Sequence, residues 1–251
     1  MSLTMPSTNP LNQFRINEGT LREGIPVEKG VVLTQEFLEQ NEKLIGDYCN
    51  YFLRNPDLFL DTIKSKECPI KFFYYQRILL RAMMRYRFFF GTFTRGTSKS
   101  FIAILSQYLS CIFLPGSKRF LVSQFKKASL DITKAKLEEI WTWFPILKNE
   151  LESWKMSTDY IELKFKNRSL FQILTLSASA RGQRATGGVM EEAALIDGQV
   201  LNEVILPMMS VPRRGPNGLV DPDEPHQQQI YITSAGAKTT FAYERLVEMV
   251  V

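Results

Sequence analysis

The sequence is short of the residues on which many enzymes depend. It holds one histidine, His226, and three cysteines, Cys49, Cys68 and Cys111, with no CxxC pair. A single histidine excludes a three-histidine zinc site and an HExxH metalloprotease helix, and it leaves a serine or cysteine nucleophile only one imidazole partner. Widely separated cysteines in odd number indicate neither a zinc ribbon nor a disulfide framework and are typical of a reducing, cytoplasmic setting. Any chemistry must therefore rest on Lys, Arg, Asp, Glu, Ser and backbone amides.

Long apolar runs are also absent. The longest apolar stretch, residues 101–114, is interrupted by serine and glutamine and is too short to span a bilayer. Residues 1–14 are polar and lack the apolar region of a signal peptide. With 45% hydrophobic and 23% charged residues, the composition predicts a globular protein that has one large domain, or one domain and an appendage.

Positive charge is concentrated in one segment. The formal net charge of the chain is +5, but residues 71–100 hold seven lysines and arginines and no acid, so the rest of the chain carries −2. Such a field predicts a polyanionic partner, either a nucleotide phosphate or a nucleic acid. Three of these cations, Arg77, Arg81 and Arg85, recur every four residues and would share one helix face. That face is a candidate for DNA contact, and a solvated helix surface is the alternative.

The apolar pattern predicts a helical amino-terminal appendage, residues 1–65, and an α/β core, residues 66–251. Residues 1–30 are rich in Pro, Asn, Gly and Thr, which predicts an arm or strap. In the core, strands alternate with helices, as in a mostly parallel sheet with crossover helices. The predicted strands are 87–92, 119–123, 160–165, 170–174, 188–191 and 229–233, with 160–174 as a hairpin. The predicted helices are 34–54, 57–63, 70–86, 100–113, 128–144, 199–209 and 239–250, and residues 212–228 form a proline-rich surface loop.

The sharpest motif is a strand, a loop and a helix around residues 87–113. The loop ends in Lys99-Ser100, and in phosphate loops such a lysine reaches the terminal phosphates while the hydroxyl binds Mg²⁺. The usual pattern GxxxxGK[ST] would place glycines where this sequence has Phe93 and Ser98, so Gly96 must supply the conformational freedom. The alternative is an ordinary strand–helix junction with a chance Lys-Ser pair.

Two adjacent glutamates, Glu191 and Glu192, end a short apolar strand further along the chain. In phosphate-loop ATPases, one acid at a strand end holds Mg²⁺ and the next polarises the attacking water. Paired glutamates elsewhere lie mostly on helix surfaces, but here the residues on both sides are apolar. The apolar setting favours the catalytic interpretation.

Three further segments carry polar residues that suit a nucleotide site: Tyr75-Gln76, Arg181 with Arg184, and Thr233-Ser234. The first precedes the initial strand, where a ring could stack on adenine and an amide could read it; a core aromatic with a surface glutamine is the alternative. The two arginines could neutralise charge in phosphoryl transfer or form a basic surface loop. The last pair ends a strand at the edge where parallel sheets bind ligands.

Taken in order, the segments between residues 70 and 236 resemble the ATPase domain of the large terminase subunit, the DNA-packaging motor of tailed bacteriophages and herpes-type viruses. The resemblance implies a phosphate-loop fold of the additional-strand, catalytic-glutamate (RecA-like) type. Terminases carry a deviant phosphate loop with an arginine four residues before the lysine, and Arg95 stands in that place before Lys99. Ser98 replaces the family's usual glycine just before the lysine.

The resemblance also implies a role for each matching residue. ATP binding falls to Tyr75, Gln76, Arg95, Gly96, Thr97, Ser98, Lys99 and Ser100, and Mg²⁺ binding to Ser100 and Glu191. Catalysis falls to Glu192, Lys99, Arg95, Arg181 and Arg184, and the coupling of hydrolysis to DNA movement to Thr233, Ser234 and Gly236. One or more of the arginines would reach the ATP of a neighbouring subunit.

By the same resemblance, we expect Mg²⁺-dependent ATP hydrolysis that drives double-stranded viral DNA into a procapsid. The expected partners are double-stranded DNA, the portal protein of the procapsid, the small terminase subunit and further copies of the chain in a ring of five, with no membrane. The expected setting is the host cell cytoplasm and, transiently, the procapsid.

Relatives in this family continue into a nuclease domain of ribonuclease H type, built on clustered aspartates and Mg²⁺. After Gly236 this sequence holds only Glu244 and Glu248 as acids, so we expect a motor domain without nuclease activity. Two other functions stay open at this point. One is a helicase-like or other nucleic-acid-dependent phosphate-loop ATPase, and the other is a nucleotide-binding or DNA-binding scaffold that does not hydrolyse ATP.

Overall fold

The chain separates into two compact units, Met1–Asp47 and Tyr48–Val251. Apart from the side chains of 126–129, 175 and 241, the computed structural model describes residues 39, 41–123, 126–157, 160–175, 184–215, 217–234 and 241–250. The predicted amino-terminal arm, Arg181 and Gly236 lie outside the described residues. Among the helices that are described, none combines the length and the apolar character needed to cross a membrane.

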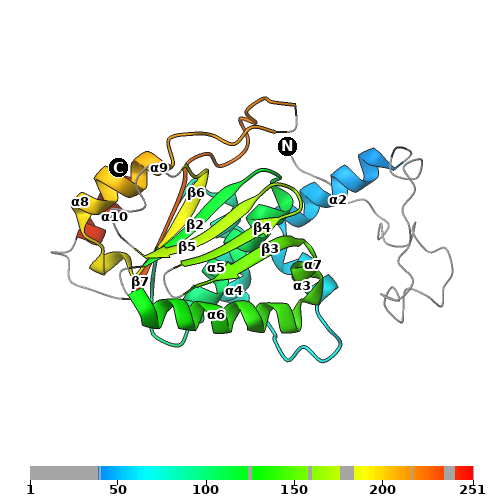
Figure 1. Ribbon diagram of the computed structural model, residues 1–251, viewed down its shortest axis with the longest axis horizontal. Helices are drawn as coiled ribbons and strands as arrows, with labels where there is room; N and C mark the ends of the chain where they lie inside the picture. Colours follow the sequence, from blue (N-terminus) through cyan, green and yellow to red (C-terminus); the bar gives the residue numbers. More distant parts are fainter. Residues whose placement is uncertain are drawn as a thin grey trace. The chain divides into compact units, whose positions relative to one another are not determined.

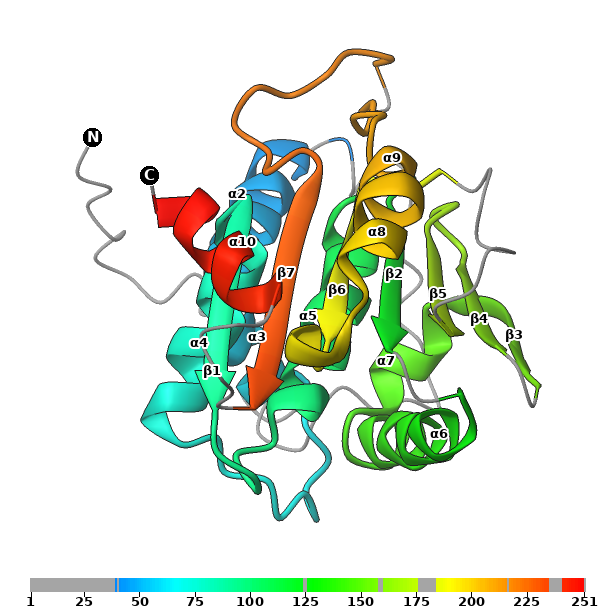
Figure 2. The same cartoon turned by 90° about the vertical axis from the view of Figure 1, so that its left-hand side faces the viewer.

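A seven-stranded sheet forms the centre of the second unit, and Figure 2 shows its strands in order from one edge to the other. The order is β1 (Phe88–Phe93), β7 (Gln228–Ser234), β6 (Gly187–Glu191), β2 (Lys118–Ser123), β5 (Leu170–Thr175), β4 (Tyr160–Phe165) and β3 (Leu151–Met156). The first five strands are parallel, and β4 and β3 continue the sheet antiparallel. Because β7 lies between β1 and β6, the sheet has the additional-strand arrangement. The predicted α/β fold, with a mostly parallel sheet and the 160–174 hairpin, is confirmed.

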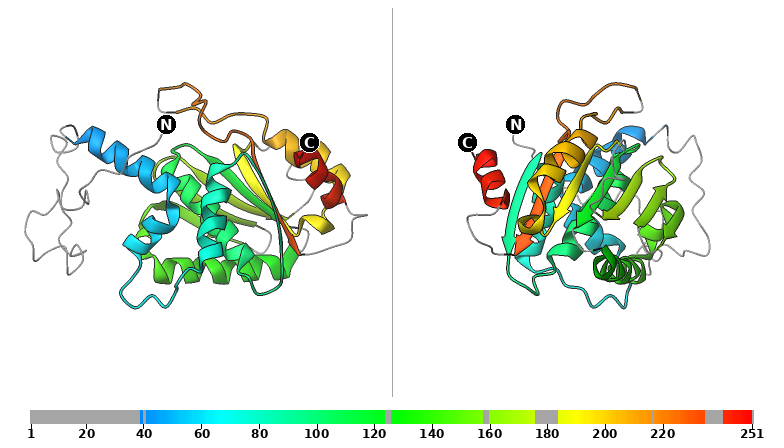
Figure 3. Two further views of the ribbon diagram at one scale, coloured as in Figure 1. Left: turned by 180° about the vertical axis from the view of Figure 1, so that it is seen from behind. Right: turned by 60° about the vertical axis from the view of Figure 1, so that its left-hand side comes forward.

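The two faces of the sheet are covered by different helices (Figures 1 and 3). Side chains alternate along each strand, so Val189 and Ile230 enter one hydrophobic cluster and their neighbours Met190 and Tyr231 enter the other. The first cluster is completed by α4 (Tyr74–Arg85), α5 (Lys99–Phe113) and α6 (Lys126–Trp143). The second is completed by the helical segments that follow β6 and by α10 (Phe241–Val250).

Helix α5 is the most deeply buried helix of the core. Every residue from Phe101 to Cys111 is buried, which explains why the longest apolar stretch of the sequence lies here. The remaining helical elements are α2 (Glu42–Arg54), α3 (Pro56–Ile63), α7 (Pro145–Asn149), η3 (Ala193–Leu195), α8 (Gly198–Val200), the π-helical η4 (Leu201–Ile205) and α9 (Leu206–Met208). The predicted helix 199–209 is therefore helical throughout but changes its hydrogen-bond register midway.

The sequence pattern does not predict β3 or α7. Strand β3 lies at the edge of the sheet, where residues 152–155 are exposed and only Leu151 is buried, so its sequence lacks an apolar pattern. Pro145, which directly follows the predicted helix 128–144, occupies the first turn of α7, where a missing N–H costs nothing. Strand β3 is at the other end of the sheet order from β1, which leads into the phosphate loop, and α7 contacts β3.

Among the described residues of the predicted proline-rich loop 212–228, residues 212–227 form neither helix nor strand, as predicted, and Gln228 begins β7; the loop is not wholly a surface feature. Arg213 and Glu224 are both buried, and the Arg213 Nε donates to the Glu224 Oε1 at 2.8 Å. The Arg213 Nη1 also donates to the Pro115 carbonyl at 3.0 Å. The ion pair joins two parts of the loop, and the bond to Pro115 fastens the loop to the body of the unit.

The predicted DNA-contacting arginine face requires correction. The Arg81 Nε donates to the Asp57 Oδ1 at 2.6 Å, and the Arg77 Nη1 lies 3.0 Å from the Asp57 Oδ2 and 2.7 Å from the Asp61 Oδ2. Both acids belong to α3, and Asp57 is only 1% exposed. Two of the three arginines therefore hold α3 against α4, and only Arg85 of the three is fully exposed.

Replacing Asp57 with asparagine is expected to lower the free energy of unfolding by about 2 kcal/mol at pH 7. The loss stays below that of a fully buried ion pair because the Arg77 and Arg81 side chains are 27% and 39% exposed and can turn to water. Burial alone would raise the pKa of Asp57, but hydrogen bonds from Arg81 and Arg77 more than offset it and hold that pKa below its ordinary value. The stabilisation is thus complete above the unfolded-state pKa and is lost as the pH falls through the lower folded-state pKa. Urea unfolding of both proteins at pH 7 and pH 3 measures this, and an equal difference at the two pH values would contradict it.

Candidate active site

Three strands and one helix bring predicted site residues together at the edge of the sheet that is formed by the carboxyl ends of the parallel strands. Strands β1, β7 and β6 are parallel neighbours, so their carboxyl ends meet, and the last residues Phe93 and Ser234 lie opposite each other in register. The loop 94–98 leads from β1 into α5, which begins at Lys99. Strand β6 ends at Glu191. This edge is where parallel sheets bind ligands.

The phosphate loop takes two left-handed backbone conformations. Gly96 has φ +82°, with open space where a Cβ would stand, and Ser98 has φ 56° and ψ 26°. A left-handed backbone costs a residue other than glycine about 1–2 kcal/mol. Ser98 therefore adopts, at an energetic cost, a conformation that the usual glycine at that position would adopt freely. Ser98 makes no side-chain cap on α5. The first amides of this 15-residue helix therefore remain available to an anion.

Replacing Ser98 with glycine is expected to raise the free energy of unfolding slightly, by about 0.5 kcal/mol. Relief of the left-handed strain, about 1–2 kcal/mol, is partly offset by the greater freedom of glycine in the unfolded chain, about 0.4–1 kcal/mol. The matched control, Gly96→Ala, is expected to do the opposite, because it adds a Cβ to a left-handed residue. Thermal unfolding of the pair measures both effects, and a Ser98→Gly protein less stable than wild type would contradict the account.

Lys99 lies at the centre of the polar contacts. Its Nζ forms an ion pair with the Glu192 Oε1 at 2.8 Å and donates to the Ser234 Oγ, also at 2.8 Å. The Lys99 side chain is 12% exposed and that of Glu192 is 28% exposed. The Ser234 N–H donates to the Glu192 Oε2 at 3.2 Å. One lysine, one glutamate and one serine from three separate elements thus form a closed cluster.

A second contact joins the loop helix to the neighbouring glutamate. The Ser100 hydroxyl donates to the Glu191 carboxylate, and Glu191 is buried. A hydroxyl and a carboxylate oxygen side by side are a donor set that suits Mg²⁺, which binds few protein oxygens and keeps water or phosphate oxygens as its other ligands. Among the residues that the structure describes, His, Cys, Asp and Glu form no group of three or more that could hold a metal ion by themselves.

The segment before β1 also approaches the loop. The Tyr75 hydroxyl donates to the Thr97 carbonyl at 3.4 Å, and the Thr97 hydroxyl donates to the Thr94 carbonyl at 3.0 Å. Gln76 is buried, and its Oε1 accepts from the Phe73 N–H at 2.9 Å, so it caps the start of α4. Tyr75 therefore borders the site directly, whereas the Gln76 carbonyl already has a structural partner. Adenine recognition by these two residues stays a prediction.

The structure places the predicted arginines differently. Arg95 is exposed at the tip of the phosphate loop, whereas Arg184 is exposed just before the amino end of β6, at the opposite end of that strand from Glu191. Arg181 and Gly236, which were also predicted to act here, lie outside the described residues.

The charges of Glu191 and Lys99 also act on Lys136 of α6, a residue that the sequence does not single out. Burial lowers the pKa of Lys136, the negative charges of Glu191 and Glu139 raise it, and the positive charge of Lys99 lowers it further. These influences place its ammonium group in the electrostatic field of the cluster. Lys136 is one of several lysines on α6 and carries no motif, so only the packing of α6 beside α5 identifies it.

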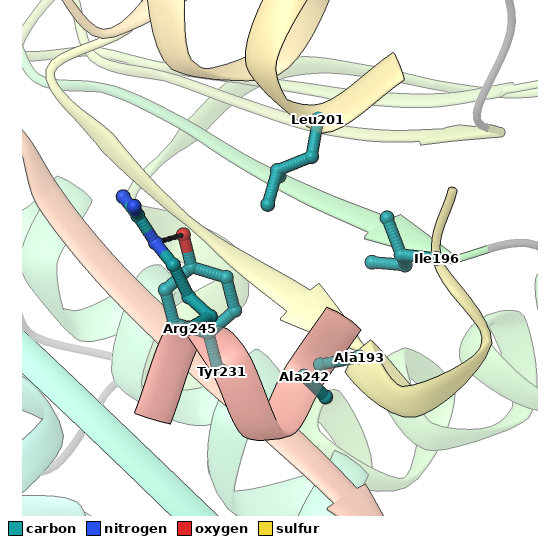
Figure 4. Close-up of a pocket in the computed structure, with 6 residues that line it drawn as sticks. All are labelled: Ala193, Ile196, Leu201, Tyr231, Ala242 and Arg245. Atoms are coloured by element: carbon teal, nitrogen blue, oxygen red, sulfur yellow. Dashed lines mark hydrogen bonds between the residues drawn. The ribbon is translucent and has the colours of Figure 1, made fainter. Parts of the chain in front are cut away.

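A small apolar pocket lies against the turn that follows Glu192 (Figure 4). It is lined by Ala193, Ile196, Leu201, Tyr231, Ala242 and Arg245. The Arg245 Nε donates to the Tyr231 hydroxyl at 3.1 Å, which ties α10 to β7. The pocket has no polar atoms from the phosphate loop, so it is part of the packing around the site and not the ligand-binding region.

Comparison with known proteins finds similar structures but no matching family model or curated sequence. No family model matches the sequence. No curated protein matches it either. Among solved structures, the large terminase of bacteriophage HK97 aligns with a TM-score of 0.54 at 10% identity, over 72% of this chain and 37% of that chain. This chain has the fold of the ATPase domain of phage large terminases.

Other terminase structures match over similar lengths. The large terminase ATPase domain of Thermus phage P74-26 aligns over 78% of this chain and 92% of that domain, at 16% identity and a TM-score of 0.47. The large terminase of another thermophilic bacteriophage, in complex with ADP, aligns over 65% of this chain and 39% of that chain, at 13% identity and a TM-score of 0.40. At 10% identity, the likeness to the HK97 terminase shows the fold alone, and activity is argued from the site itself.

Proposed function

We propose that this chain is the motor domain of a terminase large subunit, an Mg²⁺-dependent ATPase that drives double-stranded viral DNA into a procapsid. The observation that carries the proposal is the cluster of Lys99, Ser100, Glu191 and Glu192 at the carboxyl ends of β1 and β6, beside the uncapped start of α5. A cation, a hydroxyl and two carboxylates around a helix amino terminus are the groups that phosphoryl transfer requires. The terminase fold supports the packaging role.

Binding of ATP would use the loop and its neighbours. The amides of residues 96–100 and the Lys99 ammonium would hold the phosphates, in place of the contacts that Lys99 now makes with Glu192 and Ser234. Tyr75 borders the loop and would stack on the adenine ring, with Gln76 beside it. The loop residues Arg95, Thr97 and Ser98 would complete the phosphate cradle.

Ser100 and Glu191 would hold Mg²⁺, because their oxygens already adjoin each other. When bound, the ion neutralises phosphate charge as the transferred group separates. Glu192 would orient the attacking water and accept its proton, since it is the carboxylate next to the ion-binding glutamate and remains partly exposed to solvent. Arg95, Arg181 and Arg184 would supply further positive charge, one or more of them to the ATP of a neighbouring subunit.

A motor of this kind would work in an assembly. We propose that copies of the chain form a ring of five on the portal protein of the procapsid, in the host cytoplasm, with the small terminase subunit delivering DNA. Residues 1–65 would be an appendage to the core at residues 66–251. Thr233, Ser234 and Gly236 would couple hydrolysis to movement, because the Ser234 N–H donates to the Glu192 carboxylate and the Thr233 hydroxyl accepts from the Ala194 N–H in the turn after Glu192.

The experiment that tests this function separates it from the helicase and scaffold alternatives. Protein, ATP and Mg²⁺ are added to a duplex that carries a short triplex-forming third strand. A packaging motor is expected to displace the third strand and leave the duplex intact. Separation of the duplex strands would favour a helicase, and ATP binding without phosphate release would favour a scaffold.

A further inference from the structure

The turn that carries Glu192 is held from one side by the end of β7. Glu192 has φ 51° and ψ 50°, a left-handed conformation that a glutamate rarely adopts and that its surroundings must maintain. The turn continues directly into η3, where the Leu195 N–H donates to the Glu192 carbonyl at 2.8 Å. A small change in this turn would rotate the carboxylate away from the phosphate loop.

Thr233 is the side chain that fixes the turn. Its hydroxyl accepts a hydrogen bond from the Ala194 N–H at 3.2 Å and donates one to the Ser234 carbonyl at 3.2 Å. Thr233 is 4% exposed, so water cannot readily replace these bonds. The hydroxyl thereby links the backbone two residues after Glu192 to the backbone of β7.

The position of β7 explains why this residue can act on the glutamate. Because β7 lies between β1 and β6, its end touches both the phosphate-loop side and the glutamate side of the site. Ser234 contacts both sides directly, since its hydroxyl accepts from Lys99 and its N–H donates to Glu192. Thr233 contacts neither side chain, and its bonds reach only the backbone on either side of the carboxylate.

We infer that Thr233 is a positioning residue for Glu192 in ATP hydrolysis itself, in addition to any part it plays in coupling hydrolysis to DNA movement. The inference rests on the proposed ATPase function. It differs from a pure coupling role in one respect that can be measured. A residue that only couples would leave hydrolysis without DNA intact, whereas a positioning residue sets that rate directly.

The test compares Thr233→Val, which keeps the shape and removes the hydroxyl, with Thr233→Ser, which keeps the hydroxyl. Valine is expected to lower kcat for ATP without DNA about tenfold or more, because small misplacements of a catalytic group have effects of that size. The ADP dissociation constant is expected to stay within about twofold of wild type, since Thr233 makes no contact in the phosphate loop, and serine is expected to restore kcat.

Thr186→Val is the matched control. The Thr186 hydroxyl also accepts from one N–H and donates to one carbonyl, both of Lys118, and it is buried at the opposite edge of the sheet. It is expected to lose stability to a similar degree as Thr233→Val and to keep wild-type kcat. Amide hydrogen exchange gives a readout that does not depend on activity: the Ala194 amide should exchange faster in Thr233→Val and not in Thr233→Ser.

The outcomes separate the two claims. Wild-type protein that releases no phosphate would overturn the proposed function and this inference with it. Wild-type protein whose hydrolysis depends on Glu192 but is unchanged in Thr233→Val would overturn only the positioning role. Equal loss of kcat in Thr233→Val and Thr186→Val would also overturn it, because a general loss of stability would then explain both.

Discussion

Replacing Glu192 with glutamine is expected to abolish ATP hydrolysis while nucleotide binding persists. Glutamine has nearly the same shape and cannot accept the proton of the attacking water, and loss of a general base lowers rates by about 10²–10⁴-fold. Glu191→Gln is the matched control, because it changes the neighbouring carboxylate, which contacts Ser100 and not Lys99. Both variants are expected to lose phosphate release, and ADP binding in the presence of Mg²⁺ distinguishes them, because only Glu191 would hold the ion. Unchanged turnover in Glu192→Gln would sink the assignment of Glu192.

The same substitution carries a second expected result. The Lys99 ammonium is paired with the Glu192 carboxylate at 2.8 Å, so a phosphate that binds Lys99 must compete with that carboxylate. The Glu192 side chain is 28% exposed, which limits the strength of the pair. We therefore expect Glu192→Gln to bind ADP about two- to fivefold more tightly than wild type, the range of a partly exposed ion pair. Weaker ADP binding would contradict a competition between phosphate and carboxylate.

Replacing Lys99 with alanine is expected to weaken nucleotide binding by about 10–100-fold, the range for a lost hydrogen bond to a charged group. Phosphate release at moderate ATP should fall to background, because Lys99 is the only lysine among residues 94–100. Lys134→Ala is the matched control, since Lys134 lies on α6 and pairs with Asp131 at 3.7 Å. Isothermal titration with ADP measures the effect. Equal affinity in Lys99→Ala and wild type would contradict the assignment of Lys99 to the phosphates, and equal phosphate release in the two proteins would support the scaffold alternative.

The site could be located from the sequence because its residues interrupt apolar segments. Glu191-Glu192 and Thr233-Ser234 are polar pairs at the ends of buried strands, and Lys99-Ser100 opens a helix that is otherwise apolar. Parallel strands put all of these ends at one edge of the sheet. The fold class followed from the same alternation of buried strands and helices.

The pairing of the charged residues could not be predicted in the same way. Residues 71–100 contain no acid, yet Arg77 and Arg81 are neutralised by Asp57, which lies in the preceding helix α3. A local charge count cannot detect a partner that is brought in by helix packing. The contact between Lys99 and Ser234 likewise joins residues 135 positions apart, and it depends on the order of strands in the sheet.

The backbone of the phosphate loop was predicted only in part. The sequence predicts conformational freedom at Gly96, which is left-handed, but it does not predict that Ser98 is left-handed as well, because serine rarely adopts that conformation. Edge strand β3 could not be predicted, because only one of its side chains is buried and its sequence therefore has no apolar pattern. Sequence periodicity indicates which residues are buried, so it does not reveal an element that is exposed.

The most direct test of the central claim is phosphate release from ATP by wild-type and Glu192→Gln protein at equal concentration, each with linear duplex DNA and either Mg²⁺ or EDTA. The account predicts steady release by wild type with Mg²⁺, and release at the protein-free background in EDTA and in Glu192→Gln under both conditions. Release by wild type that persists in EDTA, or that Glu192→Gln matches, would contradict it.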